Sequence, residues 1–172
     1  MVRAVFAVLL VVILSSSCGY KVAGRGSHLP KDWKTVAVPP LVNKTSRYRI
    51  EQRLTEALVR ELITRTKFRV VPEETSADAV FSGEVMSVEA NPVLFDAATG
   101  RATTMVVTVH VKAKLIDRNS KKEYFRSDDY VFREQYEVST DINSFFEEQE
   151  PALNRLARDF ASRLVSAVLE GF

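Results

Sequence analysis

A chain of 172 residues has room for one ordinary domain after a short leader, because domains usually span ~100–200 residues. Apolar residues make up 46% of the chain and charged residues 27%, a balance typical of a globular protein and not of a disordered one. The formal net charge of +2 argues against general nucleic-acid binding, so any recognition of anions must depend on a local cluster of Lys and Arg.

The first seventeen residues have the layout of a signal peptide. Arg3 supplies one positive charge, an apolar run covers residues 4–14, and three serines follow it. This run is shorter than the ~20 residues that a membrane-spanning helix needs, so a spanning anchor is the less favoured alternative. We therefore expect residues 1–17 to be removed and the protein to be exported.

Cys18 is the single cysteine of the chain, although exported proteins usually pair their thiols. Its position directly after the apolar run and three small residues resembles the lipobox of bacterial lipoproteins. Ser15 stands where that pattern has an apolar residue, usually Leu. The resemblance implies that Cys18 becomes the lipidated, palmitate-bearing first residue of the mature chain, and Gly19 in place of Asp implies the outer membrane. The alternative is a soluble periplasmic protein with a spare thiol.

The N-terminal part of the mature chain predicts a tether, then a strand, then a helix. Residues 18–34 contain glycine, serine and proline without periodicity, which indicates a lipidated N-terminus and tether. Residues 35–38 predict a short strand that ends at two prolines. Residues 43–45 fit a glycosylation sequon, but in a bacterial chain they favour a turn. Apolar residues at helical spacing then predict an amphipathic helix over 48–65.

The middle of the chain predicts four strands. Residues 68–71 predict a strand that can pair in parallel with the first through a right-handed crossover. A third strand is expected from 77 to about 89, before a loop over 91–102 that contains proline and glycine. Strict alternation of apolar and polar residues over 104–115 predicts one buried and one polar face. A turn and a further strand over 123–137 complete an antiparallel hairpin.

The C-terminal residues predict a second amphipathic helix. Apolar residues recur at helical spacing from Leu153 to Val168, Pro151 suits the first turn, and Phe145 and Phe146 allow an earlier start. The order of elements predicts one α+β domain over 35–172. Its two helices should pack on one face of a mixed, mainly antiparallel sheet of four to five strands.

The sequence gives little indication of a catalytic site or a metal-binding site. His28 and His110 are the only histidines, and no second cysteine could join them in a zinc site. No Gly-x-Ser-x-Gly turn is present. Adjacent carboxylates at 128–129 and 147–148 are more typical of solvated surface than of acid/base catalysis. We therefore expect no enzyme, no metal and no cofactor.

Five motifs occur in a characteristic order along the mature chain. They are residues 18–24 (CGYKVAG), 29–30 (LP), 36–45 (VAVPPLVNKT), the helix over 51–62, and 77–85 (ADAVFSGEV). Together they resemble the lipopolysaccharide-assembly lipoprotein family LptE. The resemblance implies a domain on the periplasmic side of the outer membrane that sits inside the large barrel protein LptD as its plug. It also implies a role in delivering lipopolysaccharide to the cell surface, with no nucleic-acid partner.

A second resemblance competes with the first. The strand, Asn-x-Thr loop, helix and Ala-Asp-x-x-x-x-Gly series is also similar to lipoproteins that activate penicillin-binding proteins or serve secretion assemblies. The Cys-Gly-Tyr start and the long alternating hairpin favour the LptE family.

Lipopolysaccharide carries phosphates and acyl chains, so a helper domain needs fixed cations beside an amphipathic surface. Alternation places Lys112 and Lys114 on one polar strand face, and we expect them to contact lipid A phosphates. Arg133 on the next strand could extend that face, as could three basic residues of the intervening turn, namely Arg118, Lys121 and Lys122. The alternative is ordinary solvated sheet surface or charge that protects an edge strand.

Overall fold

Three long strands make up most of the sheet in the computed structural model, which describes residues 28–138 and 149–171. They are β4 (Ala79–Phe95), β5 (Ala102–Asp117) and β6 (Glu123–Glu137). The short strands are β1 (Thr35–Ala37), β2 (Val42–Asn43) and β3 (Arg69–Val71). The helices are α2 (Ile50–Arg65), the 3₁₀ turn η1 (Glu74–Ser76) and α3 (Gln149–Glu170).

The sheet is mixed and has the order β3-β1-β4-β5-β6, with β2 paired to β4 beyond β1. β1 runs parallel to both β3 and β4, which confirms the predicted parallel pair joined through a helix. The long strands are antiparallel to one another. The sheet thus has six strands where four to five were expected, because the two-residue β2 is too short to produce a sequence pattern.

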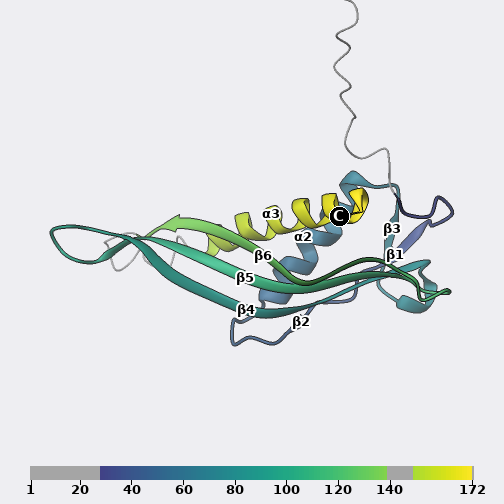
Figure 1. The fold of residues 1–172 in the computed structure, drawn as a ribbon, viewed down its shortest axis with the longest axis horizontal. Coiled ribbons are helices and arrows are strands. Elements are labelled where there is room, and N and C mark those ends of the chain that lie inside the picture. The colour runs from purple at the N-terminus through teal and green to yellow at the C-terminus, as the bar shows by residue number, and fades with distance from the viewer. Residues whose placement is uncertain (1–27, 139–148, 172) are drawn as a thin grey trace, which may run out of the picture.

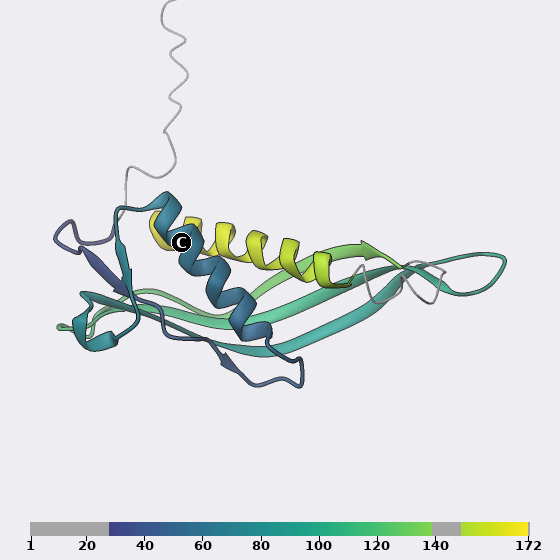
Figure 2. The ribbon, with the colours of Figure 1, turned by 180° about the vertical axis from the view of Figure 1, so that it is seen from behind.

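Both helices cover the same face of the sheet, as Figures 1 and 2 show from opposite sides. Buried leucines and isoleucine recur along one side of α2 at helical spacing. On α3, Phe160 is fully buried and packs against Phe132 of β6, with ring centroids 4.7 Å apart. From β5 the core receives the alternating side chains Val107, Val109, Val111, Ala113 and Leu115. The predicted α+β architecture is confirmed.

The other face of the long strands carries no helix among the described residues, and we call it the open face. Its members include Ser82, Glu84, His110, Lys112, Lys114 and Arg133, which alternate with core residues. The hairpin of β4 and β5 extends well past the helices, and the C-terminal end of α3 lies toward the opposite end of the molecule (Figure 1). The fold is therefore elongated along the strands.

A carboxylate fixes the start of β1. Asp78 Oδ2 accepts hydrogen bonds from Lys34 N (2.8 Å), Thr35 N (2.9 Å) and Thr35 Oγ1 (2.8 Å). The backbone N–H of Lys34 is the largest of the causes that lower the pKa of Asp78, followed by the N–H and hydroxyl of Thr35. Because Asp78 directly precedes β4, its charged carboxylate ties the start of β1 to the start of β4.

The loop before α2 is built around Asn43, which confirms the predicted turn role. Its Oδ1 accepts hydrogen bonds from Thr45 N and Thr45 Oγ1, at 2.9 and 2.7 Å. Its Nδ2 donates to Arg47 O and Glu51 Oε2, each at 2.8 Å. The asparagine therefore holds the loop against the first turn of α2.

The predicted loop over 91–102 is wrong for its first residues. β4 continues to Phe95, and the connection to β5 is a short turn over residues 96–101. Pro92 stands opposite Met105 in the register, next to a β-bulge. Proline is tolerated in an edge strand and at a β-bulge. Besides the bulge, this part of β4 is an edge, because β1 and β2 pair with β4 only up to Val85.

The predicted tether over 18–34 also extends too far. Leu29 and Trp33 are buried in the core, with 5% and 6% of their surface exposed. Trp33 packs edge-on against Tyr124, with ring centroids 4.8 Å apart. The packed region thus begins before residue 35, because isolated apolar residues without periodicity can still fill a core. Phe145 and Phe146 lie outside the described residues.

Candidate functional site

The two predicted lysines lie side by side on the open face. Lys112 and Lys114 of β5 are exposed and alternate with the buried residues of that strand. The register places Glu84 of β4 opposite Lys112, and Ser82 of β4 and Arg126 of β6 on either side of Lys114. The lysines are thus flanked by one acidic and one basic side chain from neighbouring strands.

A shallow depression of about 380 Å³ lies over these residues. It is bounded by Val42 of β2 and by open-face side chains of all three long strands, including Lys112, Lys114, Arg126 and Asp128. Gly83 lies at its base, where a Cβ would come within 2.6 Å of Lys112 O and 2.9 Å of Leu41 Cδ2. The absence of a side chain at Gly83 therefore lets β5 and the segment before β2 approach β4 closely.

The charges of the depression are mixed, and their pairing decides which cations are free. Arg126 forms ion pairs with Asp128 (3.1 Å) and Glu123 (3.4 Å). The hydrogen bond with Asp128 is the main cause that raises the pKa of Arg126. Lys112 and Lys114 form no ion pair within the described part of the chain. Two unpaired ammonium groups on one strand can bind an anionic oxygen group such as a phosphate.

The other predicted cations do not join this depression. Arg133 shares the open face but stands opposite Thr108, four residues or about 13 Å along β5 from Lys112. Between them lies the pair formed by His110 Nδ1 and Asp129 Oδ1, at 2.7 Å. Arg133 is therefore a separate cation on the same face.

The basic turn residues are held by local contacts. Arg118 Nε donates a hydrogen bond to Ala77 O at 2.7 Å. The ammonium of Lys122 lies 4.9 Å from the ring centre of Tyr124, a cation–π contact. Lys121 has a left-handed backbone with φ of 60°. Arg118 and Lys122 thus serve the turn and do not line the depression.

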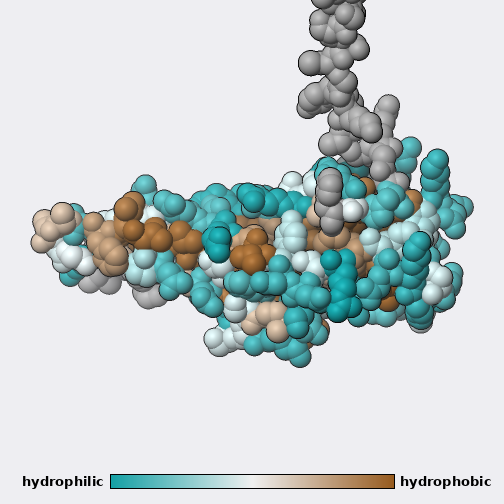
Figure 3. Space-filling view, in the orientation of Figure 1, coloured by the Kyte–Doolittle hydropathy of each residue, from teal (hydrophilic) through white to brown (hydrophobic). Residues whose placement is uncertain are grey.

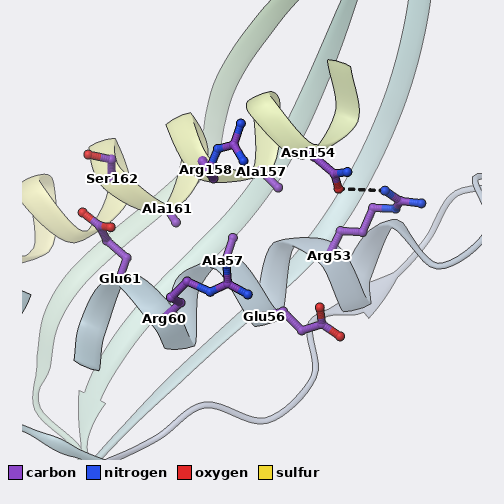
Figure 4. Close-up of a pocket in the computed structure, with 10 residues that line it drawn as sticks. All are labelled: Arg53, Glu56, Ala57, Arg60, Glu61, Asn154, Ala157, Arg158, Ala161 and Ser162. Atoms are coloured by element: carbon purple, nitrogen blue, oxygen red, sulfur yellow. Dashed lines mark hydrogen bonds between the residues drawn. The ribbon is translucent and has the colours of Figure 1, made fainter. Parts of the chain in front are cut away.

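A second hollow, which the sequence did not predict, lies between α2 and α3 and has a volume of about 470 Å³ (Figure 4). Ala57 of α2 and Ala157 and Ala161 of α3 point into the gap between the helices. Arg53 reaches across it to Asn154 Oδ1 at 2.8 Å and forms an ion pair with Glu150. The hollow forms where α2 and α3 pack side by side. The small residues at helical spacing are the only feature of the sequence that pointed to it.

Within residues 28–138 and 149–171, no group of three or more His, Cys, Asp or Glu side chains lies close enough to hold a metal ion. Nor does any helix in these ranges have the length and apolar character needed to cross a membrane. Cys18 lies outside the described residues.

Comparison with known families adds to this geometry. The model of the LptE family, described as lipopolysaccharide-assembly, matches residues 33–168. The chain belongs to the LptE family. The match runs from Trp33 to Val168 and so includes every described strand, α2 and all but the last two residues of α3. Among curated proteins, no sequence matches the chain.

Solved structures with the same fold include several bacterial lipoproteins. Uncharacterized lipoprotein B from Nitrosomonas europaea is 17% identical, with a TM-score of 0.57 over 88% of this chain and 90% of that one. The rare lipoprotein B from Shewanella oneidensis is 14% identical, with a TM-score of 0.55 over 77% and 94%. PelC from Paraburkholderia phytofirmans, a dodecamer, is 17% identical, with a TM-score of 0.51 over 77% and 86%. At these identities the likeness shows the fold that the LptE-family chain shares with them.

Proposed function

We propose that this chain is an outer-membrane lipoprotein that helps to deliver lipopolysaccharide to the cell surface as the plug and partner of an LptD-like β-barrel. The observation that carries the proposal is the match of the lipopolysaccharide-assembly family model over residues 33–168. In this proposal Cys18 carries the lipid, and the domain faces the periplasm. Several acyl chains would anchor it stably, since each buried methylene contributes ~0.8 kcal/mol.

The open face supplies the chemistry that the proposal needs. Lys112 and Lys114 would bind a phosphate of lipid A, because their ammonium groups are exposed and unpaired within the described residues. Arg133, about 13 Å farther along β5, would meet a second anionic group of the same large ligand. The ion pair between Arg126 and Asp128 would border the phosphate site without competing for the lysines.

The central experiment is depletion combined with copurification from outer membranes. Loss of the protein should reduce surface lipopolysaccharide, and a tagged copy should retrieve a large barrel protein in a stable complex. Normal surface lipopolysaccharide together with retrieval of a peptidoglycan synthase and no barrel would refute the proposal. Labelled palmitate should be incorporated into the wild-type protein but not into Cys18→Ala. Equal labelling of the two proteins would remove the lipid anchor from the proposal.

The competing function, a part in a secretion assembly, predicts a different oligomeric state. PelC shares the fold and assembles as a dodecamer, whereas a plug of one barrel is expected as a single copy. Light scattering on the purified protein distinguishes the two. An assembly of many copies would favour the secretion assembly, whereas a monomer would count against it and leave the barrel partner and the penicillin-binding-protein activator to be separated by copurification.

A further inference from the structure

His110 lies on the open face between the two groups of cations that the proposed function uses. It stands on β5 two residues from Lys112, and its partner on β6 is Val131. Arg133 stands opposite Thr108, two residues from His110 on the other side. Alternate residues of a strand lie about 6.6 Å apart, so His110 divides the distance of about 13 Å between Lys112 and Arg133 into two equal steps.

One carboxylate orients the imidazole and leaves its second nitrogen free. His110 Nδ1 lies 2.7 Å from Asp129 Oδ1. An ionised carboxylate only accepts hydrogen bonds, so Nδ1 carries a proton and donates it in this contact. Nε2 has no hydrogen-bond partner among the residues that the structure describes, and 32% of the side chain is exposed. Nε2 is therefore the atom that can gain a proton and donate a hydrogen bond to a ligand arriving from solvent.

The surroundings of the ring are polar, charged and uncovered. Figure 3 shows hydrophilic residues along the middle of the long strands, while apolar surface gathers at the end of the β4–β5 hairpin, at the left. The charged groups around the ring come from all three long strands and are Glu84 and Glu89 of β4, Lys112 of β5, and Asp129 and Arg133 of β6. A ligand can therefore reach Nε2 and the neighbouring cations from the same side.

Protonation of the ring changes the charge that lies between the two groups of cations. With a neutral ring, the pair of His110 and Asp129 has one net negative charge, which repels an anionic group. A proton on Nε2 makes the pair neutral and supplies a charge-assisted donor on the side of the ring away from Asp129. Histidine side chains gain this proton between about pH 8 and pH 5. The open face is thus more favourable to anions in the lower part of this range.

We propose that His110 is a binding residue of the open face, and that its Nε2–H donates to an anionic oxygen group of the ligand. The contact joins Lys112 and Lys114 to Arg133 in one binding surface. The inference rests on the proposed function and adds two properties to it. Binding strengthens as the ring gains its proton, and ligands with several phosphate groups gain more than ligands with one, because only they span the surface.

The binding test uses the mature chain from residue 18 with Cys18→Ser, and lipopolysaccharide as the probe, at about pH 6 and pH 8. Relative to His110→Gln, the wild type should gain about threefold or more in affinity at the lower pH, the size of an exposed ion pair. Comparison at each pH cancels the titration of the probe's own phosphates. His28→Gln is the matched control, because His28 is the only other histidine and bonds Tyr124 O at 3.0 Å.

The control should keep the pH dependence of the wild type, and retention of that dependence by His110→Gln would overturn the proposal. Calorimetry in buffers of different ionisation enthalpy gives a second readout, the number of protons taken up on binding near neutral pH. The wild type should take up more protons than His110→Gln, and equal uptake would also overturn the proposal. Absence of binding at either pH would overturn this inference and the lysine site together, whereas binding with unchanged pH dependence in His110→Gln would overturn this inference alone.

Discussion

The indole of Trp33 donates a hydrogen bond to the carboxylate of Asp117, with 2.9 Å between Nε1 and Oδ2. This bond joins the segment before β1 to the end of β5, 84 residues later in the chain. Asp117 also accepts hydrogen bonds from Asn119 N and Ser120 N in the turn to β6, at 2.9 and 2.7 Å. One carboxylate thus links the N-terminal segment to the hairpin that carries the candidate site.

Trp33→Phe should keep most of the ring packing and lose this hydrogen bond. We expect the free energy of unfolding to fall by about 1–3 kcal/mol, mainly because the smaller ring leaves part of the buried indole's volume empty, while the turn N–H groups still satisfy Asp117. The pKa of Asp117 is lowered first by Ser120 and then by Trp33, so it should rise in the variant and remain below its usual value. Urea unfolding and a carboxyl NMR titration measure the two effects. An unchanged Asp117 pKa would contradict the assignment.

Asp78→Asn should destabilise the fold at neutral pH by about 1–2 kcal/mol, because a neutral amide is a weaker acceptor for Lys34 N and Thr35 N. The pKa of Asp78 is lowered in the folded state, so its contribution is present above the unfolded pKa of about 3.9 and is lost as pH falls through the folded value. The variant should therefore lose less stability than the wild type in acid. Parallel acid titration slopes for the two proteins would contradict this.

Gly83→Ala should distort the candidate site. A Cβ would lie 2.6 Å from the carbonyl oxygen of Lys112, a backbone atom that cannot move without shifting β5. We expect a loss of about 1–3 kcal/mol of stability, as for overpacked cores. Gly100→Asn is the control, because nothing lies within 4 Å of Gly100 and asparagine tolerates its positive φ. Equal unfolding midpoints for Gly83→Ala and the wild type would show that the strands have room to separate.

Lys112→Glu combined with Lys114→Glu should weaken binding of lipopolysaccharide by about tenfold or more, because two charge-assisted contacts are lost. Lys31→Glu with Lys67→Glu is the charge-matched control, since both lysines are exposed and lie outside the strands. The measurement uses the mature chain with Cys18→Ser. If the control weakens binding as much as the site variant, overall charge and not the open face governs the interaction.

Much of the fold could be predicted because its strands and helices bury one face each. The alternation over β5 identified both faces of that strand, and β6 was bounded at Glu123 and Glu137 as the structure has it. β4 was underestimated because Pro92 normally ends a strand, and only the absence of a neighbour beyond Val85 makes it tolerable there. A single buried residue has no period, so the sequence alone places Trp33 in the tether.

The candidate site was predicted in part, for a similar reason. Alternation alone placed Lys112 and Lys114 on one face. Their surroundings depend on register, which β-bulges shift between Val85 and Ser87 and again between Val111 and Ala113. Sequence periodicity does not reveal such shifts, so neither the depression nor the separation of Arg133 from it could be foreseen.

The positions of the chain entry and of the end of the β4–β5 hairpin constrain how the molecule can be oriented. A Cβ on Gly171, just past α3, would lie 2.8 Å from the His28 ring, so the first described residue adjoins the last turn of α3. Ten Cα–Cα steps lead from Cys18 to His28, a reach of at most about 35 Å, whereas the seventeen residues of β4 alone span about 56 Å. With Cys18 as the anchor, the α3 end of the domain must therefore stay near the membrane surface, whereas the end of the β4–β5 hairpin can lie far from it.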